Sequence, residues 1–266
     1  MKKERVNSRK IEPAALSVKK LQEILSSEYL NDEEIELLCK DPRKGVHELL
    51  LAYRRRIRTG DAERERIHRM SLRERELQEQ GHSLVAGIDE AGRGPLAGPV
   101  VAAAVILDWR KESLWEGLDD SKKLTASARE RLFTVLAAEA TAIAVGVVDH
   151  ALIDRINIYQ ASLEAMRLAV RQLHPQPHYL LCDGFSLPGM DIPQEGIRGG
   201  DASCLCIAAA SIVAKVMRDH IMNGFAALYP GYGFDQHKGY ATSYHHVMLQ
   251  VLGPSPLHRH SFRWGI

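Results

Sequence analysis

Asp89-Glu-Ala-Gly92-Arg93-Gly94-Pro95-Leu-Ala-Gly98-Pro99 is the stretch of sequence that decides the fold. Two short apolar runs flank it, Leu84–Ile88 and Val100–Leu107, and each has the length and composition of a buried β-strand. Glycine and proline concentrate between the two runs, as they do in turns. The sequence therefore predicts that the two strands and the glycine-rich turn form a hairpin at the start of the main domain.

Strands and helices alternate after this hairpin. Apolar runs predict strands at Ala142–Val148 and Tyr179–Cys182. Apolar residues at helical spacing predict helices at Ala126–Ala138, Ile158–Leu173, Ala202–Met222 and Ala241–Leu252. A hairpin followed by alternating helices and strands is typical of an α/β fold in which helices flank a mixed sheet.

The first 75 residues have a different character, because their apolar residues follow helical spacing throughout. Helices are predicted from Ser17 to Ser27, after an Asn31–Glu34 capping box, and in a segment that ends in Arg54–Arg55–Arg56. Residues 61–80 are mostly charged, so we expect an exposed helix or a linker there. We predict a helical N-terminal extension over 1–75 and a main domain over 76–266.

The two parts also differ in charge. Residues 1–75 contain 19 Lys and Arg against 14 Asp and Glu, a net charge of +5, and residues 76–266 contain 16 against 20, a net charge of −4. A basic extension beside an acidic domain suits an arm that binds phosphates near a site built of carboxylates. A solvated helical surface has the same composition, so charge alone leaves both interpretations open.

Composition excludes several classes of protein. Hydrophobic residues make up 45% of the 266 residues, which indicates a globular chain. No apolar run approaches the roughly 18 residues of a membrane span, and the charged start of the chain is unlike a secretion signal. We expect a cytoplasmic protein that does not bind a membrane. Its four cysteines form no Cys-x-x-Cys pair, and we favour packing over metal binding for them.

Four acidic residues stand where predicted strands or helices begin or end. Asp89 and Glu90 follow the first strand, Asp183 follows Tyr179–Cys182, and Asp201 precedes a long apolar helix. Charged groups are rarely buried without a partner, so a carboxylate pair at the end of a buried strand needs a cation. Clustered carboxylates are the hard oxygen ligands that Mg²⁺ and Mn²⁺ prefer. Two such ions about 4 Å apart activate water and stabilise the leaving oxygen of a phosphodiester.

Each acid also has a structural interpretation. Asp201 is a natural helix N-cap, and Asp183 before Gly184 suits a plain turn. A glycosidase pair is an alternative that needs no ion, but it uses only two acids and does not explain the glycine-rich turn. The adjacent Asp89 and Glu90 are the hardest to explain by structure alone, because neighbouring strand residues point to opposite faces.

The glycines of the turn resemble a dinucleotide-binding fingerprint only superficially. The spacing of Gly92, Gly94 and Gly98 is one residue too long, and the following segment is predicted to be a strand rather than a helix. Glycines also allow a backbone to approach a ligand closely, and Arg93 can reach a phosphate. Backbone groups beside a metal centre can test for a sugar 2′-hydroxyl, which distinguishes RNA from DNA.

The turn and its flanks, Asp89 to Val100, resemble the signature of bacterial ribonuclease HII, a type 2 ribonuclease H. The resemblance covers about 84–262, and the Gly-Arg-Gly of the turn favours this family over ribonuclease HIII. Further matching segments follow in the expected order: Asp119-Asp-Ser-Lys-Lys-Leu124, Ile156-Asn-Ile-Tyr-Gln160, Asp183-Gly184, Gly200-Asp-Ala202 and Gly233-Phe-Asp-Gln-His-Lys-Gly-Tyr240.

This resemblance implies a ribonuclease H-like fold and an endonuclease. The implied substrates are RNA–DNA hybrids and duplex DNA that contains ribonucleotides. Cleavage would occur on the 5′ side of a ribonucleotide, leaving 3′-hydroxyl and 5′-phosphate ends. The implied cofactors are two Mg²⁺ or Mn²⁺ ions, and we expect a monomer. The implied metal ligands and catalytic residues are Asp89, Glu90, Asp183 and Asp201.

The resemblance also implies roles for residues that contact the substrate. Gly92, Arg93 and Gly94 would recognise the 2′-hydroxyl, and Tyr240 would stack on the sugar of the next deoxynucleotide. Phosphate contacts are expected from Ser121, Lys122, Lys123 and Lys238. Packing remains an alternative for Tyr240, and a solvated surface remains one for the lysines.

Other interpretations lead to different experiments. The His258-Arg259-His260 segment has too few ligands for zinc, so we expect phosphate or packing contacts there. Another two-metal nuclease of the same fold would cut all-DNA duplexes. A non-catalytic nucleic-acid-binding module would not need all four acids, and a nucleotide-binding oxidoreductase is disfavoured by the prolines of the turn.

Overall fold

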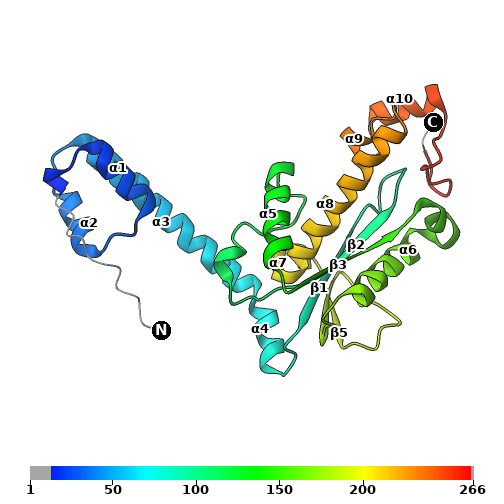
Figure 1. The fold of residues 1–266 in the computed structure, drawn as a ribbon, viewed down its shortest axis with the longest axis horizontal. Coiled ribbons are helices and arrows are strands. Elements are labelled where there is room, and N and C mark those ends of the chain that lie inside the picture. The colour runs from blue at the N-terminus through cyan, green and yellow to red at the C-terminus, as the bar shows by residue number, and fades with distance from the viewer. Residues whose placement is uncertain (1–12, 265–266) are drawn as a thin grey trace. The chain divides into compact units, whose positions relative to one another are not determined.

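The computed structural model describes residues 13–264, and contacts between residues divide the chain into two compact units. The first unit runs to Glu65 and the second begins at Arg66. Figure 1 shows the helices of the first unit and the mixed α/β architecture of the second. The division falls ten residues before the predicted boundary at residue 75.

The first unit is helical, as the sequence predicted. Its elements are a short 3-10 helix, Pro13–Ala15, followed by α1 (Val18–Ser27), α2 (Asp32–Cys39) and most of α3 (Lys44–Met70). Ser17 caps α1, and the predicted capping box of Asn31 and Glu34 is present at the start of α2. Leu21, Leu38 and Tyr53 belong to the small apolar core that holds these helices together.

The second unit begins with helices in the segment 61–80, which was predicted to be an exposed helix or a linker. The end of α3 and α4 (Leu72–Glu79) bury the side chains of Ile67, Met70 and Leu77. Met70 packs against the core of the α/β domain, and Leu77 packs near Val85. The segment 61–80 is thus largely helical and mostly exposed or half-buried, as one of the two predicted alternatives had it, but the expectation of exposure was wrong at these three residues. Two anchors on α3 and one on α4 suffice to pack these charged helices.

A five-stranded mixed sheet forms the centre of the second unit. Its strand order is β3-β2-β1-β4-β5, in which β2 pairs antiparallel with both β1 and β3, and β4 pairs parallel with β1 and β5. The strands are β1 (Val85–Ala91), β2 (Val100–Ile106), β3 (Ala142–Val148), β4 (Tyr179–Asp183) and β5 (Gln194–Ile197). The predicted hairpin is confirmed, whereas the sequence analysis missed the short edge strand β5.

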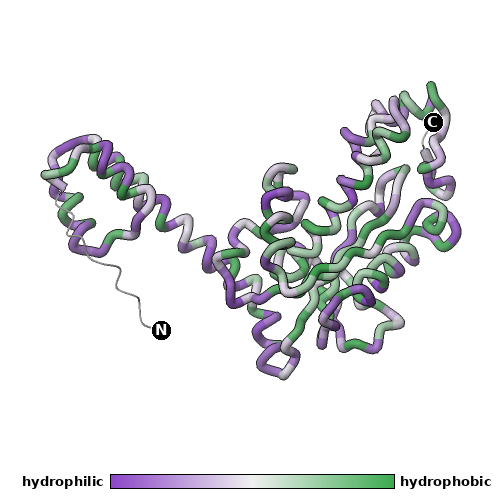
Figure 2. Tube along the Cα trace, in the orientation of Figure 1, coloured by the Kyte–Doolittle hydropathy of each residue, from purple (hydrophilic) through white to green (hydrophobic). Residues whose placement is uncertain are grey.

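Helices cover both faces of this sheet (Figure 1). α6 (His150–Gln172) packs on one face, and α5 (Ala126–Glu139) and α8 (Leu205–Leu228) pack on the other. The remaining elements are α7 (Gly200–Ser203), α9 (Phe234–His237), α10 (Ser243–Leu252) and a 3-10 turn at Glu112–Leu114. Alternate residues of β2 face opposite layers: Ala102 and Ala104 pack with α6, and Ala103 and Val105 pack with α5 and α8. Figure 2 shows the corresponding apolar strands at the centre of the unit. The fold is the predicted mixed sheet flanked by helices.

Two helices differ from their predicted form. Asn157 has non-helical backbone angles, φ 65° and ψ 164°, so α6 consists of an additional segment that begins at His150 and of the predicted helix from Ile158. The long helix predicted from Ala202 is interrupted at Cys204, whose backbone is extended with φ −127° and ψ 129°. The interruption separates α7, which contains Asp201, from α8. None of the helices within residues 13–264 has both the length and the apolar character required to cross a bilayer.

Candidate active site

The ends of two parallel strands bring the first three acids together. Strands β1 and β4 are neighbours, and Ile88 of β1 is paired with Cys182 of β4. The next residues are Asp183, the last residue of β4, and Asp89, so the two carboxylates lie at the same end of the paired strands. Asp89 and Glu90 were predicted to follow the first strand, but they lie within it because their backbone pairs with that of β2. Asp89 is only 5% exposed, although its side chain is acidic. The geometry therefore concentrates negative charge at one end of the sheet.

Asp201 joins this group through the short helix α7. The backbone N–H of Gly200 donates a hydrogen bond of 2.8 Å to Asp183 Oδ1, which places the start of α7 against the end of β4. The side chain of Asp201 is 9% exposed and accepts a 3.0 Å hydrogen bond from Lys122 Nζ. Asp201 lies within the first turn of α7 and its side chain does not cap it, since the N-cap residue is Gly199.

The acids influence one another electrostatically. Burial raises the pKa of Asp89 well above its ordinary value, and the charges of Glu90 and Asp183 raise it further. Burial also raises the pKa of Glu90, although Arg93 opposes this effect. Burial and repulsion from Asp201 raise the pKa of Asp183. Charged carboxylates at such a site need nearby cations, and an all-oxygen donor set suits Mg²⁺ or Mn²⁺.

One cleft contains most of the residues that the sequence singled out. Asp89, Glu90 and Asp183 line it, together with these predicted substrate-binding residues: Gly92, Arg93, Gly94, Ser121, Lys122 and Tyr240. Asp201 is connected to the cleft by its ion pair with Lys122. The cleft therefore combines acidic groups at its base with backbone, basic and aromatic groups around them.

Two of the predicted lysines lie outside this lining. Lys123 Nζ forms a 3.0 Å ion pair with Asp119. Lys238 Nζ donates hydrogen bonds to Asn223 Oδ1, at 2.8 Å, and to the carbonyl oxygen of Asp235. Both amino groups thus have protein partners other than the four predicted metal ligands, and neither residue is among those that line the cleft within 13–264.

Arg259 fixes the shape of the glycine-rich turn. Its guanidinium group is fully buried and donates five hydrogen bonds of 2.7–3.2 Å to the carbonyl oxygens of Gly92, Arg93, Gly98 and Pro99. This explains the basic residue of the His258-Arg259-His260 segment by packing, one of the two contacts that the sequence analysis favoured. His258 is buried and lies 3.0 Å from His245 between their Nε2 atoms.

Arg218 of α8 also donates hydrogen bonds to the glycine-rich turn. Its guanidinium group donates to the carbonyl oxygens of Pro99, Ala97 and Lys238 at 3.0–3.2 Å. A Cβ atom at Gly92 would lie 2.1 Å from Arg218 Nε, and the positive φ of 97° also favours glycine there. The turn therefore needs glycine both for its backbone conformation and for the close approach of Arg218.

Tyr240 lies against the turn. Gly94 is its neighbour there, since a Cβ atom at that glycine would stand in ordinary van der Waals contact with Tyr240 Cε1, at 3.8 Å. The Leu96 N–H donates to the carbonyl oxygen of Gly239 at 2.8 Å, which fixes the tyrosine loop to the turn. The Tyr240 ring is 42% exposed and has Lys215 Nζ 5.9 Å from its centre. The ring is thus held in place with part of its surface open to a ligand.

The sequence analysis missed several residues of the site. Ser211 and Lys215 of α8 line the cleft, and Arg218 and Arg259 hold the turn. One signal was present, because Ser211, Lys215 and Arg218 recur at helical spacing on a helix that is otherwise apolar at its start. No comparable pattern marks Arg259.

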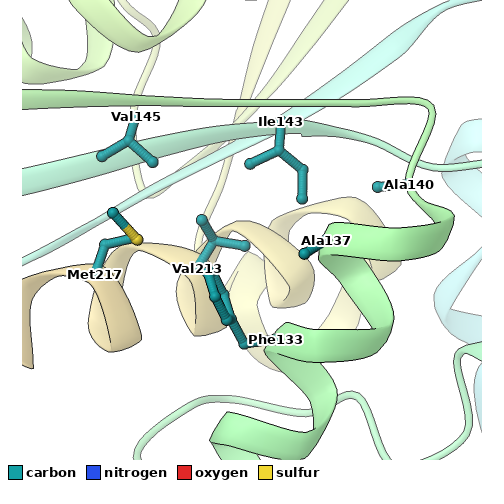
Figure 3. A pocket seen from close by; sticks show the side chains of 7 residues that line it. All are labelled: Phe133, Ala137, Ala140, Ile143, Val145, Val213 and Met217. Carbon is teal, nitrogen blue, oxygen red and sulfur yellow. The ribbon is translucent and has the colours of Figure 1, made fainter. Parts of the chain in front are cut away.

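A second concavity has a different chemical character. Apolar side chains of α5, β3 and α8 surround it, including Phe133, Val145 and Met217, as Figure 3 shows. No titratable side chain is among the residues that line it. It offers no group for acid–base or metal chemistry, so the cleft at the acids is the candidate active site.

Comparison with known proteins agrees with this geometry. The family model for ribonuclease HII matches residues 86–264, and the model for the ribonuclease HII N-terminal domain matches residues 17–78. The chain belongs to the ribonuclease HII family. This membership confirms the predicted enzyme class, an endonuclease of the ribonuclease H type that acts on RNA in RNA–DNA hybrids and depends on divalent metal ions.

Individual relatives show how far the similarity extends. A ribonuclease HII of Bacillus mycoides (strain KBAB4) is 48% identical over 242 residues, which is 91% of this chain and 92% of that protein. The crystal structure of ribonuclease H2 from Pyrococcus horikoshii OT3 is 27% identical with a TM-score of 0.59, covering 68% of this chain and 94% of that one. Bst-RNase HIII in complex with Mn²⁺ shares the fold at 19% identity and a TM-score of 0.52, covering 70% and 65%.

Proposed function

We propose that this enzyme cuts on the 5′ side of ribonucleotides, both in RNA–DNA hybrids and within duplex DNA, and leaves 5′-phosphate and 3′-hydroxyl ends. The observation that carries the proposal is that one cleft contains three acids, the glycine-rich turn and an exposed tyrosine ring. Acids alone would suit any metal nuclease, whereas the turn and the ring provide a means of recognising a ribose next to a deoxyribose.

Two divalent ions, Mg²⁺ or Mn²⁺, would bind to Asp89, Glu90, Asp183 and Asp201. Such ions supply positive charge for the scissile phosphate and activate water. The chain contributes the fixed positions of the ligands: β1 and β4 hold Asp89 and Asp183 at the same edge of the sheet, and the Gly200 N–H orients Asp183. Because the folded chain already holds the carboxylates together, little reorganisation is required when the ions bind.

The glycine-rich turn would recognise the 2′-hydroxyl of the ribonucleotide. The backbone of Gly92 and Gly94 lines the cleft without side chains that would separate it from a sugar. Arg218 and Arg259 hold this backbone from behind. A hydroxyl bound in this way favours a ribonucleotide, since a deoxynucleotide would leave the backbone groups unpaired.

Tyr240 would stack on the sugar that follows the ribonucleotide, and basic side chains would bind the phosphates. Lys122 and Lys215 both line the cleft, and Lys215 lies beside the Tyr240 ring. A ribose held at the turn and a deoxyribose held at the ring define an RNA-to-DNA junction, because Tyr240 lies directly against Gly94.

A cleavage map would test this proposal. The substrates are three labelled duplexes of one sequence: all DNA, DNA with a single ribonucleotide, and an RNA–DNA hybrid, each incubated with Mg²⁺, Mn²⁺ or a chelator. We expect one metal-dependent cut on the 5′ side of the single ribonucleotide and no cut in the all-DNA duplex. Cleavage of the all-DNA duplex would instead indicate a nuclease that does not recognise ribose.

Variants would assign the roles of the residues. Asp183→Asn should abolish cleavage while largely preserving duplex binding, since a lost metal ligand acts mainly on the transition state. Tyr240→Ala should weaken binding of the RNA-to-DNA junction, and Tyr240→Phe, which keeps the ring, should weaken it less. Normal cleavage by Asp183→Asn would contradict the ligand assignment.

We also propose that the N-terminal unit binds the duplex through basic side chains of α3. Arg54, Arg55 and Arg58 are exposed on this helix. If each contacts a phosphate, replacing all three by Gln should reduce the salt dependence of duplex binding by up to about 3 units of log–log slope. The control is Lys20→Gln with Lys40→Gln, because these lysines pair with Glu23 and Glu36. Equal slopes of duplex binding against salt concentration for the two variants would contradict this proposal.

Substitution is preferable to deletion for this test. A cut at residue 75 would remove Ile67 and Met70, which are buried against the core of the α/β domain. A truncated chain would then lose stability as well as phosphate contacts, and weaker binding would have two causes.

A further inference from the structure

A second group of potential metal ligands lies in the interior of the α/β domain. Glu74 of α4 meets Cys204 and Cys206, which stand on either side of the first residue of α8. All three are buried, with exposures of 5%, 1% and 0%. Both thiols are free, and one ligand atom from each of the three residues lies within 4.8 Å of the other two. None of the three belongs to the cleft at the four acids.

The distances between these atoms match those of a tetrahedral zinc site. The two sulfur atoms are 3.7 Å apart, and Cys204 Sγ lies 3.6 Å from Glu74 Oε1. With zinc–sulfur bonds of about 2.3 Å and a zinc–oxygen bond of about 2.1 Å, tetrahedral geometry separates two sulfurs by about 3.8 Å and a sulfur from an oxygen by about 3.6 Å. Two of the three distances between donors therefore already match this geometry, and the third, from Cys206 Sγ to the Glu74 carboxyl group, is within 4.8 Å.

The backbone explains why the two sulfurs meet. Residues two apart on a helix face different ways, so one continuous helix would hold the two sulfurs apart. Cys204 is not helical, however, because its extended backbone links α7 to α8. Cys206 is fixed by the close approach of β1, since a Cβ atom at Gly87 would lie 2.1 Å from the Cys206 backbone carbon. The break between the helices thus turns both sulfurs toward Glu74.

The carboxyl group of Glu74 has an incomplete set of partners. Its Oε1 accepts a 2.8 Å hydrogen bond from the Cys206 N–H, but its buried Oε2 accepts none from any residue within 13–264. A buried oxygen without a partner costs stability, and a buried carboxylate requires a positive charge nearby. Burial raises the pKa of Glu74, so the ionised group is disfavoured unless a cation binds. The unpartnered oxygen is independent of the distances and also indicates a ligand.

We propose that Glu74, Cys204 and Cys206 bind one thiophilic divalent ion of the zinc type, with a water molecule as the fourth ligand. Two thiolates select such an ion over Mg²⁺, which prefers oxygen donors alone. Binding would release the protons of both thiols and of the carboxyl group, so uptake weakens as the pH falls. The site would tie α4 to the junction of α7 and α8, three residues from Asp201, and so hold that acid in position.

Cobalt provides a direct probe, because thiolate-bound Co²⁺ absorbs in the near ultraviolet by sulfur-to-metal charge transfer. The full-length chain, purified without chelators and then stripped of metal, is titrated with Co²⁺ both in the native state and during refolding. We expect a charge-transfer band that saturates at one equivalent and is abolished by Zn²⁺. Co²⁺ bound by the four carboxylates produces no such band, so Asp89→Asn should retain it in full.

Variants of the ligands make the assignment specific. Cys204→Ser and Cys206→Ser should lose the band, and the matched control Cys39→Ser, at an exposed cysteine of the first unit, should keep it. Glu74→Gln keeps both thiols and should bind Zn²⁺ at least tenfold more weakly; it also remains informative if a cysteine variant fails to fold. One equivalent of Zn²⁺ should raise the melting temperature of the unsubstituted chain and of Cys39→Ser, but not of Cys206→Ser.

Two results would overturn the proposal. One is the absence of a sulfur-to-cobalt band in the folded chain, whether the metal is added before or after refolding. The other is a band of equal strength in Cys204→Ser combined with Cys206→Ser, which would place the thiolate ligand elsewhere. Neither outcome affects the proposed cleavage of ribonucleotides, which is measured with Mg²⁺ or Mn²⁺ on unmodified chain.

Discussion

Replacing Arg259 by Lys should show how much the glycine-rich turn depends on one buried side chain. Arg259 donates five hydrogen bonds to four carbonyl oxygens, including two to Gly98. Lysine keeps the positive charge but carries its donors on a single nitrogen, so it cannot span carbonyls that the guanidinium fork reaches together. At least two carbonyl oxygens of the turn should lose their donor.

The magnitude follows from these lost bonds. A hydrogen bond to a charged group contributes about 1.5–3 kcal/mol, so two lost bonds reduce the free energy of unfolding by roughly 3–6 kcal/mol. For a unit of about 200 residues, each kcal/mol lowers the melting temperature by about 2–4 °C, which predicts a decrease of at least roughly 6 °C. Burial and the nearby Arg218 lower the pKa of Arg259 to about 9, so the charged guanidinium group is less favoured here than in water.

The assay combines thermal unfolding with cleavage of a duplex that contains one ribonucleotide, measured well below the melting temperature. We expect kcat/KM to fall at least about tenfold, because a displaced turn no longer positions the ribose. Arg263→Lys is the matched control, since Arg263 is exposed in the same terminal segment. If Arg259→Lys has the same melting temperature and kcat/KM as Arg263→Lys, the turn does not depend on these hydrogen bonds and the prediction is wrong.

Two further predictions concern the acids and the turn. Burial raises the pKa of Asp89, so the folded chain binds a proton at this carboxyl group more tightly than the unfolded chain does. The stability of the metal-free chain therefore falls as the pH rises from the ordinary pKa of aspartic acid through the raised pKa of the folded chain. In a chelator at pH 8, Asp89→Asn should therefore be more stable than the unsubstituted chain by on the order of 1 kcal/mol, which raises the melting temperature by about 2–4 °C. The same variant should lose metal-dependent cleavage. A lower melting temperature would contradict the burial argument. Gly92→Ala should lower the melting temperature by the equivalent of about 2–3 kcal/mol, because the new Cβ would overlap Arg218 at a positive φ. In Gly224→Ala of α8, the described residues place no atom within 4 Å of the new Cβ apart from chain neighbours and the helix's own backbone, so this variant should be neutral or stabilising by about 0.5–1 kcal/mol. Similar losses in the two variants would refute the steric explanation.

Local patterns in the sequence determined much of the fold. The apolar runs before and after the turn became β1 and β2, and β3 occupies its predicted residues, Ala142–Val148. The capping box at Asn31 and Glu34 formed as its spacing indicated. These features depend on residues that are close along the chain, so a single sequence carries their signal.

The elements that were missed depend on neighbours that are distant in the sequence. Strand β5 is short and partly exposed, and it exists because its backbone pairs with β4. The charged segment over 61–80 packs because the sheet and α8 provide an apolar surface for Ile67 and Met70. The extended backbone at Cys204 interrupts an apolar pattern that would continue as one helix by local preference.

For the candidate site, the sequence by itself determined which residue types are available: four acids at the ends of elements, a turn of glycines and a tyrosine in a glycine-bearing loop. Only the tertiary structure decided which of them meet. The parallel pairing of β1 with β4 places Asp89 near Asp183, and Arg259 reaches the turn from more than 150 residues away. Packing turns Lys123 and Lys238 toward other partners and brings two cysteines together with Glu74. Side-chain contacts of this kind depend on how whole elements pack, and no local pattern in the chain encodes them.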